Sequence, residues 1–118
     1  MRVMIFAKTR PEYEGAPRDP GEGMEEMDRF HEELTKAGVL LESGALAPSA
    51  EGAKVRFVSS GLDVTDGPFT ESKELVAGYW LWQVRSMDEA VEWLRKAPFP
   101  DGMELELRPV AMFLEPGG

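Results

Sequence analysis

Two stretches with apolar side chains at nearly every position place the strongest limit on how this chain can fold. Residues 2–8 read RVMIFAK, and residues 78–85 read GYWLWQVR, rich in aromatic and aliphatic side chains. Successive side chains of a strand point to opposite faces of a sheet, so residues 2–8 are typical of a central strand covered on both faces. The sequence therefore predicts a sheet that contains both strands and needs a cover on each side.

Two helices and further strands are predicted around this pair. An apolar spacing of three and four sets in at Met24 and ends at Gly38, with acidic residues in the first turns and Lys36 in the last, which favours a helix. Ser86 to Glu89 has the spacing of a capping box, so a second helix is expected after it. Strands are also predicted over residues 39–47, 54–59, 62–65 and 103–108, with a loop over 9–23.

This order of elements predicts an α+β domain of the ferredoxin-like class, an antiparallel sheet with two helices on one face and an inserted hairpin. Two helices cover only one face of such a sheet. The other face would expose Met4, Phe6 and one set of side chains from residues 79–84, which are too apolar to remain in water. We therefore expect a homodimer in which a second copy covers this face.

Length and composition limit the classes of function. The 118 residues fit one domain, predicted over residues 1–118, and 13 basic against 22 acidic residues give a net charge of −9, which disfavours nucleic acid as a partner. The chain has no cysteine and no apolar run of membrane-spanning length, so we expect a cytoplasmic protein without disulfides and without a membrane segment. One histidine and no glycine-rich phosphate loop predict neither a metal site nor a cofactor.

A turn is predicted where Asp66-Gly67-Pro68-Phe69 follows a strand. The Asp66 carboxylate can accept main-chain N–H groups, Gly67 is expected to adopt backbone angles closed to other residues, and the Phe69 ring can fix the loop on the domain. Three ionisable side chains follow at positions 71, 73 and 74, an arrangement able to shift a pKa. The turn is thus either architectural or part of a site.

The segment Asp66-Gly67-Pro68-Phe69, followed by Glu71, Lys73-Glu74 and Gly78-Tyr79, resembles the signature of the DGPF proteins, a branch of the YCII-related family. The resemblance extends over nearly the whole chain. It implies a small domain of the dimeric ferredoxin-like type, the dimeric α/β barrel, and a family that is mostly uncharacterised. Genes of such proteins often lie beside sigma factors of the extracytoplasmic-function group, which implies a regulatory setting.

His31 and two arginines are candidates for chemistry outside the turn. His31 lies at the border of the apolar stripe of the first helix, where a surface position is the commoner use, and the resemblance implies an acid/base histidine on that helix. Arg56 and Arg108 would form a cationic pocket for a small carboxylate or phosphate if both faced inward; otherwise they lie in solvent.

Two functions remain open from the sequence, and so does the question whether the protein is an enzyme. The first is a small acid/base enzyme, a lyase, isomerase or monooxygenase-like protein acting on a small anionic metabolite, with Asp66, Glu71 and His31 as catalytic candidates. Its substrate contacts would be Arg56, Lys73, Phe69 and Arg108. The second is a non-catalytic ligand-binding or interaction module linked to transcription regulation by sigma factors.

Overall fold

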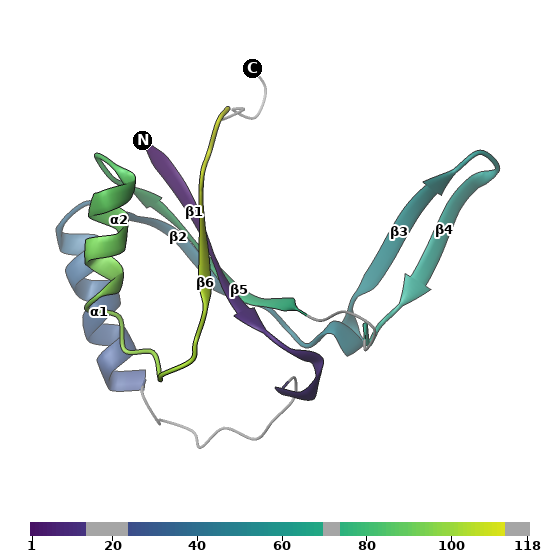
Figure 1. Ribbon diagram of the computed structural model, residues 1–118, viewed down its shortest axis with the longest axis horizontal. Helices are drawn as coiled ribbons and strands as arrows, with labels where there is room; N and C mark the ends of the chain where they lie inside the picture. Colours follow the sequence, from purple (N-terminus) through teal and green to yellow (C-terminus); the bar gives the residue numbers. More distant parts are fainter. Residues whose placement is uncertain (14–23, 70–73, 113–118) are drawn as a thin grey trace.

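The computed structural model describes residues 1–13, 24–69 and 74–112. In chain order its elements are β1 (Arg2–Thr9), the 3-10 turn η1 (Pro11–Tyr13), α1 (Met24–Lys36), β2 (Leu40–Ala45), the 3-10 turn η2 (Ser49–Glu51), β3 (Ala53–Val58), β4 (Gly61–Asp66), β5 (Leu75–Gln83), α2 (Met87–Leu94) and β6 (Leu105–Pro109) (Figure 1). The predicted helices and strands agree with the observed ones in type and order, whereas the two 3-10 turns were not predicted. Residues 14–23 of the predicted loop lie outside the described residues.

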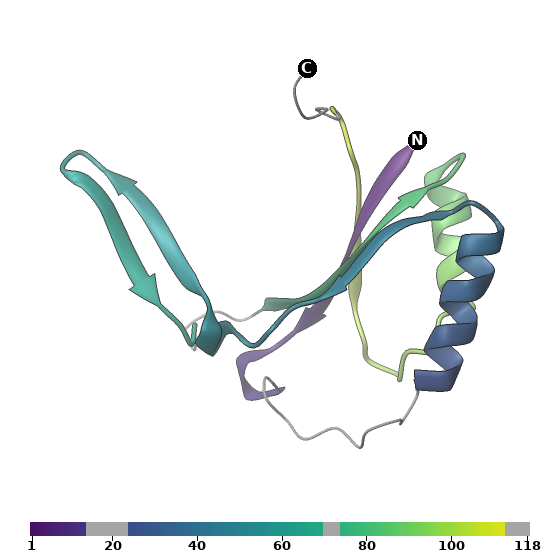
Figure 2. The ribbon, with the colours of Figure 1, turned by 180° about the vertical axis from the view of Figure 1, so that it is seen from behind.

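Four of the strands form one antiparallel sheet in the order β2-β5-β1-β6. Both helices lie on the same side of this sheet (Figures 1 and 2). The arrangement confirms the predicted α+β class, consistent with a ferredoxin-like fold in which β1 and β5 are the central strands. Pro109 lies in β6, an edge strand, as expected for a residue that has no N–H to donate.

The core lies between the sheet and the helices. Val3 and Ile5 of β1 pair in register with Trp82 and Trp80 of β5, and all four side chains are buried. The two indoles stack with centroids 5.2 Å apart, and the ring of Phe30 on α1 packs edge-on against both. Large aromatic surface removed from water therefore holds α1 on the sheet.

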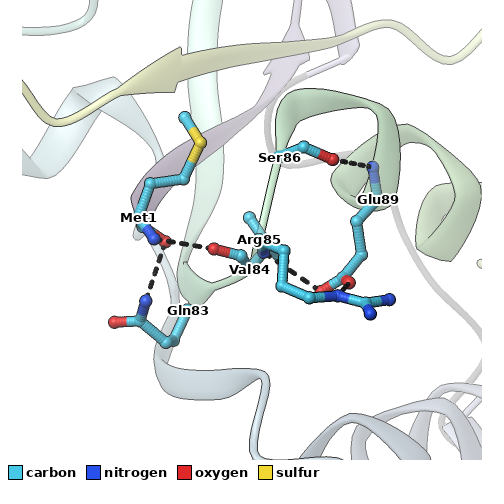
Figure 3. Close-up of polar contacts among 6 residues, drawn as sticks. All are labelled: Met1, Gln83, Val84, Arg85, Ser86 and Glu89. Atoms are coloured by element: carbon cyan, nitrogen blue, oxygen red, sulfur yellow. Dashed lines mark hydrogen bonds and ion pairs between the residues drawn. The ribbon is translucent and has the colours of Figure 1, made fainter.

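The start of the chain is fastened to the end of β5. The terminal ammonium of Met1 donates to the Val84 carbonyl at 2.7 Å, and the Val84 N–H donates back to the Met1 carbonyl (Figure 3). Ser86 caps α2 by accepting the Glu89 N–H at 3.1 Å. The Glu89 carboxylate accepts both the backbone N–H and the guanidinium of Arg85, and this hydrogen bonding lowers the pKa of Glu89.

The opposite face of the sheet is not covered by any described element. From β1 and β5 it presents Met4, Phe6, Tyr79 and Leu81, the neighbours in sequence of the buried residues. Charged side chains surround this apolar centre. Tyr79 donates to Glu42 at 3.1 Å, and Lys8 and Arg108 both contact Glu106, at 3.1 and 3.3 Å. We call this surface the open face.

Strands β3 and β4 form a separate two-stranded hairpin that points away from the helices (Figures 1 and 2). Val55 pairs with Val64 and Phe57 with Leu62, so one face of the hairpin is apolar. The pairs Arg56–Asp63 and Lys54–Thr65 lie on the other face. Every residue of the two strands is exposed. We call residues 53–66 the arm.

The predicted turn forms the joint between the arm and the sheet. The Gly67 N–H donates to the Gly52 carbonyl at 2.9 Å, and the Phe69 N–H donates to Ser49 Oγ at 3.1 Å. Gly67 does not have a positive φ, so the backbone angle expected for it is wrong. A Cβ on Gly67 would instead lie 1.6 Å from the Ser49 carbonyl oxygen, which makes close approach of the η2 turn the reason for glycine.

Candidate functional site

A pocket of about 370 Å³ lies between α1, the ends of β1, β2 and β5, and the segment after α2. Its described lining residues include no lysine, arginine, aspartate or glutamate, and the side chains that give it polar character are His31, Ser43 and Trp80. Tyr79 also belongs to the lining, but its hydroxyl donates to Glu42 on the opposite face of the sheet. The remaining lining residues are Ile5, Ala7, Met27, Gly44, Ala45, Ala77, Gly78, Phe99 and Met103. An apolar cavity with a few polar groups is the usual form of a small-molecule site.

His31 is held in this pocket by a hydrogen bond from the sheet. It follows Phe30 on α1, so its ring lies at the edge of the buried stripe and is half-buried. The indole N–H of Trp80 donates to His31 Nε2 at 2.9 Å, and the two rings meet edge to face with centroids 5.7 Å apart. The nearly buried indole N–H thereby has its acceptor, as a buried donor requires.

This hydrogen bond decides which nitrogen of His31 carries the proton. Nε2 uses its lone pair to accept from Trp80, so the neutral imidazole carries its hydrogen on Nδ1. Nδ1 makes no hydrogen bond with any residue in the described part of the chain. In this state His31 is a hydrogen-bond donor to a bound molecule and not a base.

Across residues 1–13, 24–69 and 74–112, no three His, Cys, Asp or Glu side chains are placed together in a way that could hold a metal ion. None of the helices in these ranges combines the length and the apolar character needed to cross a bilayer.

Comparison with known proteins agrees with the fold. The model of the YCII-related domain family matches residues 1–113. The chain belongs to the YCII-related family. This YCII-related domain is also similar to the uncharacterized protein R00369 of Rhizobium meliloti (strain 1021), with 31% identity over 96 residues that cover 80% of this chain and 77% of that protein.

The catalytic candidates of this YCII-related domain lie on different elements. His31 lines the pocket under α1, whereas Asp66 ends β4 at the base of the arm, is exposed and does not line that pocket. The Asp66 carboxylate makes no hydrogen bond with the residues that the structure describes. Glu71 falls outside the described residues. The structure therefore places His31 and Asp66 on separate surfaces of one chain.

The candidate substrate contacts are also dispersed. Arg56 lies on the arm opposite Asp63, and Arg108 lies on β6 and donates to Glu106, so both are exposed on different sheets. Phe69 is half-buried beside the η2 turn, with the Lys54 ammonium 4.6 Å from its ring centroid. Lys73 falls outside the described residues. Of Arg56, Phe69 and Arg108, none lines the pocket beside His31.

Sequence reasoning missed the partners of His31 in the pocket. Trp80 lies 49 residues further along the chain, and Ser43 is brought beside it by the pairing of β2 with β5. One signal was available: an indole N–H buried in a predicted central strand needs an acceptor, and His31 is the one side chain on the apolar border of the first helix with a neutral acceptor nitrogen.

Proposed function

We propose that this YCII-related domain binds a small, mostly apolar organic molecule in the pocket beside His31 and that it works as a homodimer. The observation that carries the proposal is the Trp80–His31 hydrogen bond, which leaves a donor, Nδ1–H, on a histidine that lines an otherwise apolar cavity. A single well-placed polar group in an apolar pocket orients a ligand.

The lining suggests the chemical class of the ligand. A molecule with one hydrogen-bond acceptor, such as a carbonyl or carboxylate oxygen, would accept from His31 Nδ1, and the Ser43 hydroxyl is a second polar group of the lining. The described lining residues include no cationic side chain to balance a phosphate. We therefore place neutral carbonyl compounds and monocarboxylates ahead of the more highly charged anions.

An acid/base or isomerase-type reaction is the second candidate, and His31 is the observation that favours it. A neutral imidazole that donates a hydrogen bond can polarise a carbonyl group and stabilise the negative charge that develops on its oxygen. The base in such a reaction would come from another group, and Asp66 and Glu71 remain the proposals from the sequence. A non-catalytic module serving a transcription regulator is the outcome if the ligand is bound but unchanged.

The homodimer is supported by the open face. Met4, Phe6, Tyr79 and Leu81 form an apolar centre with a charged surround, which is the common anatomy of a protein interface. A two-fold interface uses the same patch on both copies, and this patch carries both acidic and basic side chains at its edge. In such a dimer, each copy would cover the open face of the other copy's sheet.

A ligand screen tests the pocket. Small carbonyl and monocarboxylate compounds are screened by ligand-observed NMR and thermal shift against the unmodified protein, His31→Ala and Asp66→Asn. We expect compounds whose affinity falls at least tenfold in His31→Ala and by less than twofold in Asp66→Asn. Compounds that bind both variants as well as the parent protein, or that lose affinity only in Asp66→Asn, would contradict the assignment of the site to His31.

A further inference from the structure

The arm carries the most exposed apolar surface of the described chain. Phe57 is 85% exposed, and its neighbours on the same face, Val55, Leu62 and Val64, are 52%, 59% and 57% exposed. The other face of the arm is polar, with Arg56 opposite Asp63 and Lys54 opposite Thr65. An amphipathic hairpin of two strands is at best marginally stable alone in water, so its apolar face needs a partner.

No other element in the part of the chain that the structure describes supplies that partner. The two strands of the arm contact each other extensively, and neither has a substantial contact with β1, β5 or the helices. In both views the arm diverges from the sheet on the side away from the helices (Figures 1 and 2). The radius of gyration is 16.6 Å, whereas a compact domain of this length has about 13–14 Å.

We propose that the arm packs its apolar face, Val55, Phe57, Leu62 and Val64, on a second copy of this chain. This inference rests on the homodimer proposed above and extends it, because the arm becomes part of the interface. The arm projects from the sheet on the side of the open face (Figures 1 and 2). A second copy bound to the open face would therefore lie next to the arm. By two-fold symmetry the partner's arm makes the same contact in return.

The charge distribution is compatible with a second copy as the occupant and disfavours a nucleic acid. The arm holds two basic and two acidic residues, so the net charge of −9 resides entirely in the rest of the chain. Two such chains repel each other at long range. The neutral arm approaches an acidic copy without adding to that repulsion, whereas a nucleic acid would meet a chain with a strongly negative net charge.

The area of the arm also fits this role. Its four apolar side chains would contribute roughly 300–400 Å² per copy, at about 100 Å² for each side chain. A stable interface buries about 800 Å² per partner. The arm alone falls short of that value. The four apolar side chains of the open face are half-buried, so they add a smaller contact area than the arm does. Arm and open face together approach the area that a stable dimer buries.

Isotope-filtered NMR identifies the occupant. A sample mixed from ¹³C,¹⁵N-labelled and unlabelled chains reports only contacts between different copies. We expect intermolecular NOEs from the Phe57 ring and from the methyl groups of Val55 and Val64. A dimer in which these groups show only contacts within one chain would overturn the role of the arm and leave the homodimer standing. A monomer at millimolar concentration would overturn both.

A matched pair of variants measures the contribution of the arm. Phe57→Ser removes the largest apolar side chain of the arm, and Arg56→Ser makes a similar change one position away on its polar face. We expect the dimer dissociation constant to rise at least tenfold in Phe57→Ser and by less than threefold in Arg56→Ser. Equal constants for both variants, with circular dichroism unchanged, would contradict the inference. The ligand screen on His31 is independent of this result, so failure of the arm and failure of the pocket are distinguishable.

Discussion

The sheet body and the arm use the same alternation of apolar and polar residues, but only the body uses it to build a core. In β1 and β5, the residues that face the helices are buried, and Trp82 has no exposed surface. In β3 and β4, the corresponding apolar set is exposed, and Phe57 retains most of its surface. The body has α1 and α2 to cover it, whereas the arm has no covering element in the described chain.

This difference shows that period-two alternation indicates a strand with one apolar face but not what covers that face. In the body the cover comes from the same chain, so burial contributes to folding. In the arm, as on the open face, the cover would come from a second copy, so burial would contribute to assembly. The three predictions that follow separate these two uses of apolar surface.

The largest effect is expected for matched phenylalanines in the two regions. Phe30→Ala leaves a cavity beside Trp80 and Trp82 and should lower the free energy of unfolding by about 3–5 kcal/mol. Phe57→Ala should change it by less than about 0.5 kcal/mol at low protein concentration, because the side chain is exposed there. Urea unfolding at a protein concentration below the dimer dissociation constant measures both. Similar losses in the two variants would mean that the arm folds against its own chain.

An intermediate effect is expected at the joint between the two regions. Gly67→Ala places a Cβ against the Ser49 carbonyl oxygen and should cost about 1–3 kcal/mol through overpacking. Gly52→Ala is the control, because its φ is −107° and its Cβ would lie at ordinary contact distances, 3.5 Å or more, from Ser49 and Phe69. Thermal unfolding compares the stability of the two variants with that of the unmodified protein. A stable Gly67→Ala protein would show that η2 does not press against the turn.

The smallest effect is expected at the charged edge of the open face. Hydrogen bonds from Lys8 and Arg108 lower the pKa of Glu106 below its ordinary value near 4.5. A carboxyl group with a lowered folded-state pKa stabilises the protein above that ordinary value, and this stabilisation is lost as the pH falls through the lowered pKa.

Glu106→Gln should therefore lower the melting temperature slightly at pH 7, and the difference should disappear once the pH has fallen below the lowered pKa, where the parent carboxyl group is also neutral. The effect is small because exposed ion pairs contribute little. Melting temperatures of the two proteins between pH 2 and 7 measure it. A difference that stays constant over this range would exclude the charge of Glu106 as the cause.

Most of the fold could be predicted because its signals are local. The doubly apolar stretches, the stripe on α1 and the Ser86 cap each lie within one element. The start of β5 was predicted at Gly78 but lies at Leu75, because Lys8 and Thr9 extend the pairing past a bulge after Ala7. That extension depends on a strand about 70 residues away, which no local pattern reveals.

Less of the candidate site could be predicted, because it depends on contacts between distant elements. The border position of His31 follows from the helical period and correctly indicated that part of the ring is accessible. Its hydrogen bond to Trp80 depends on how α1 packs on β5 and was not predicted. Arg56 and Arg108 were predicted to form an anion site only if both faced inward. Both are exposed, as alternating charges on antiparallel strands commonly are.

Sedimentation equilibrium of the unmodified protein tests the central claim, that a second copy covers the apolar surface left bare by this chain. The account predicts a species of twice the 13.1 kDa chain mass at micromolar concentration. It also predicts that this species dissociates on dilution in Phe57→Ser before it does in the unmodified protein. A single species of 13.1 kDa that persists up to hundreds of micromolar would contradict it.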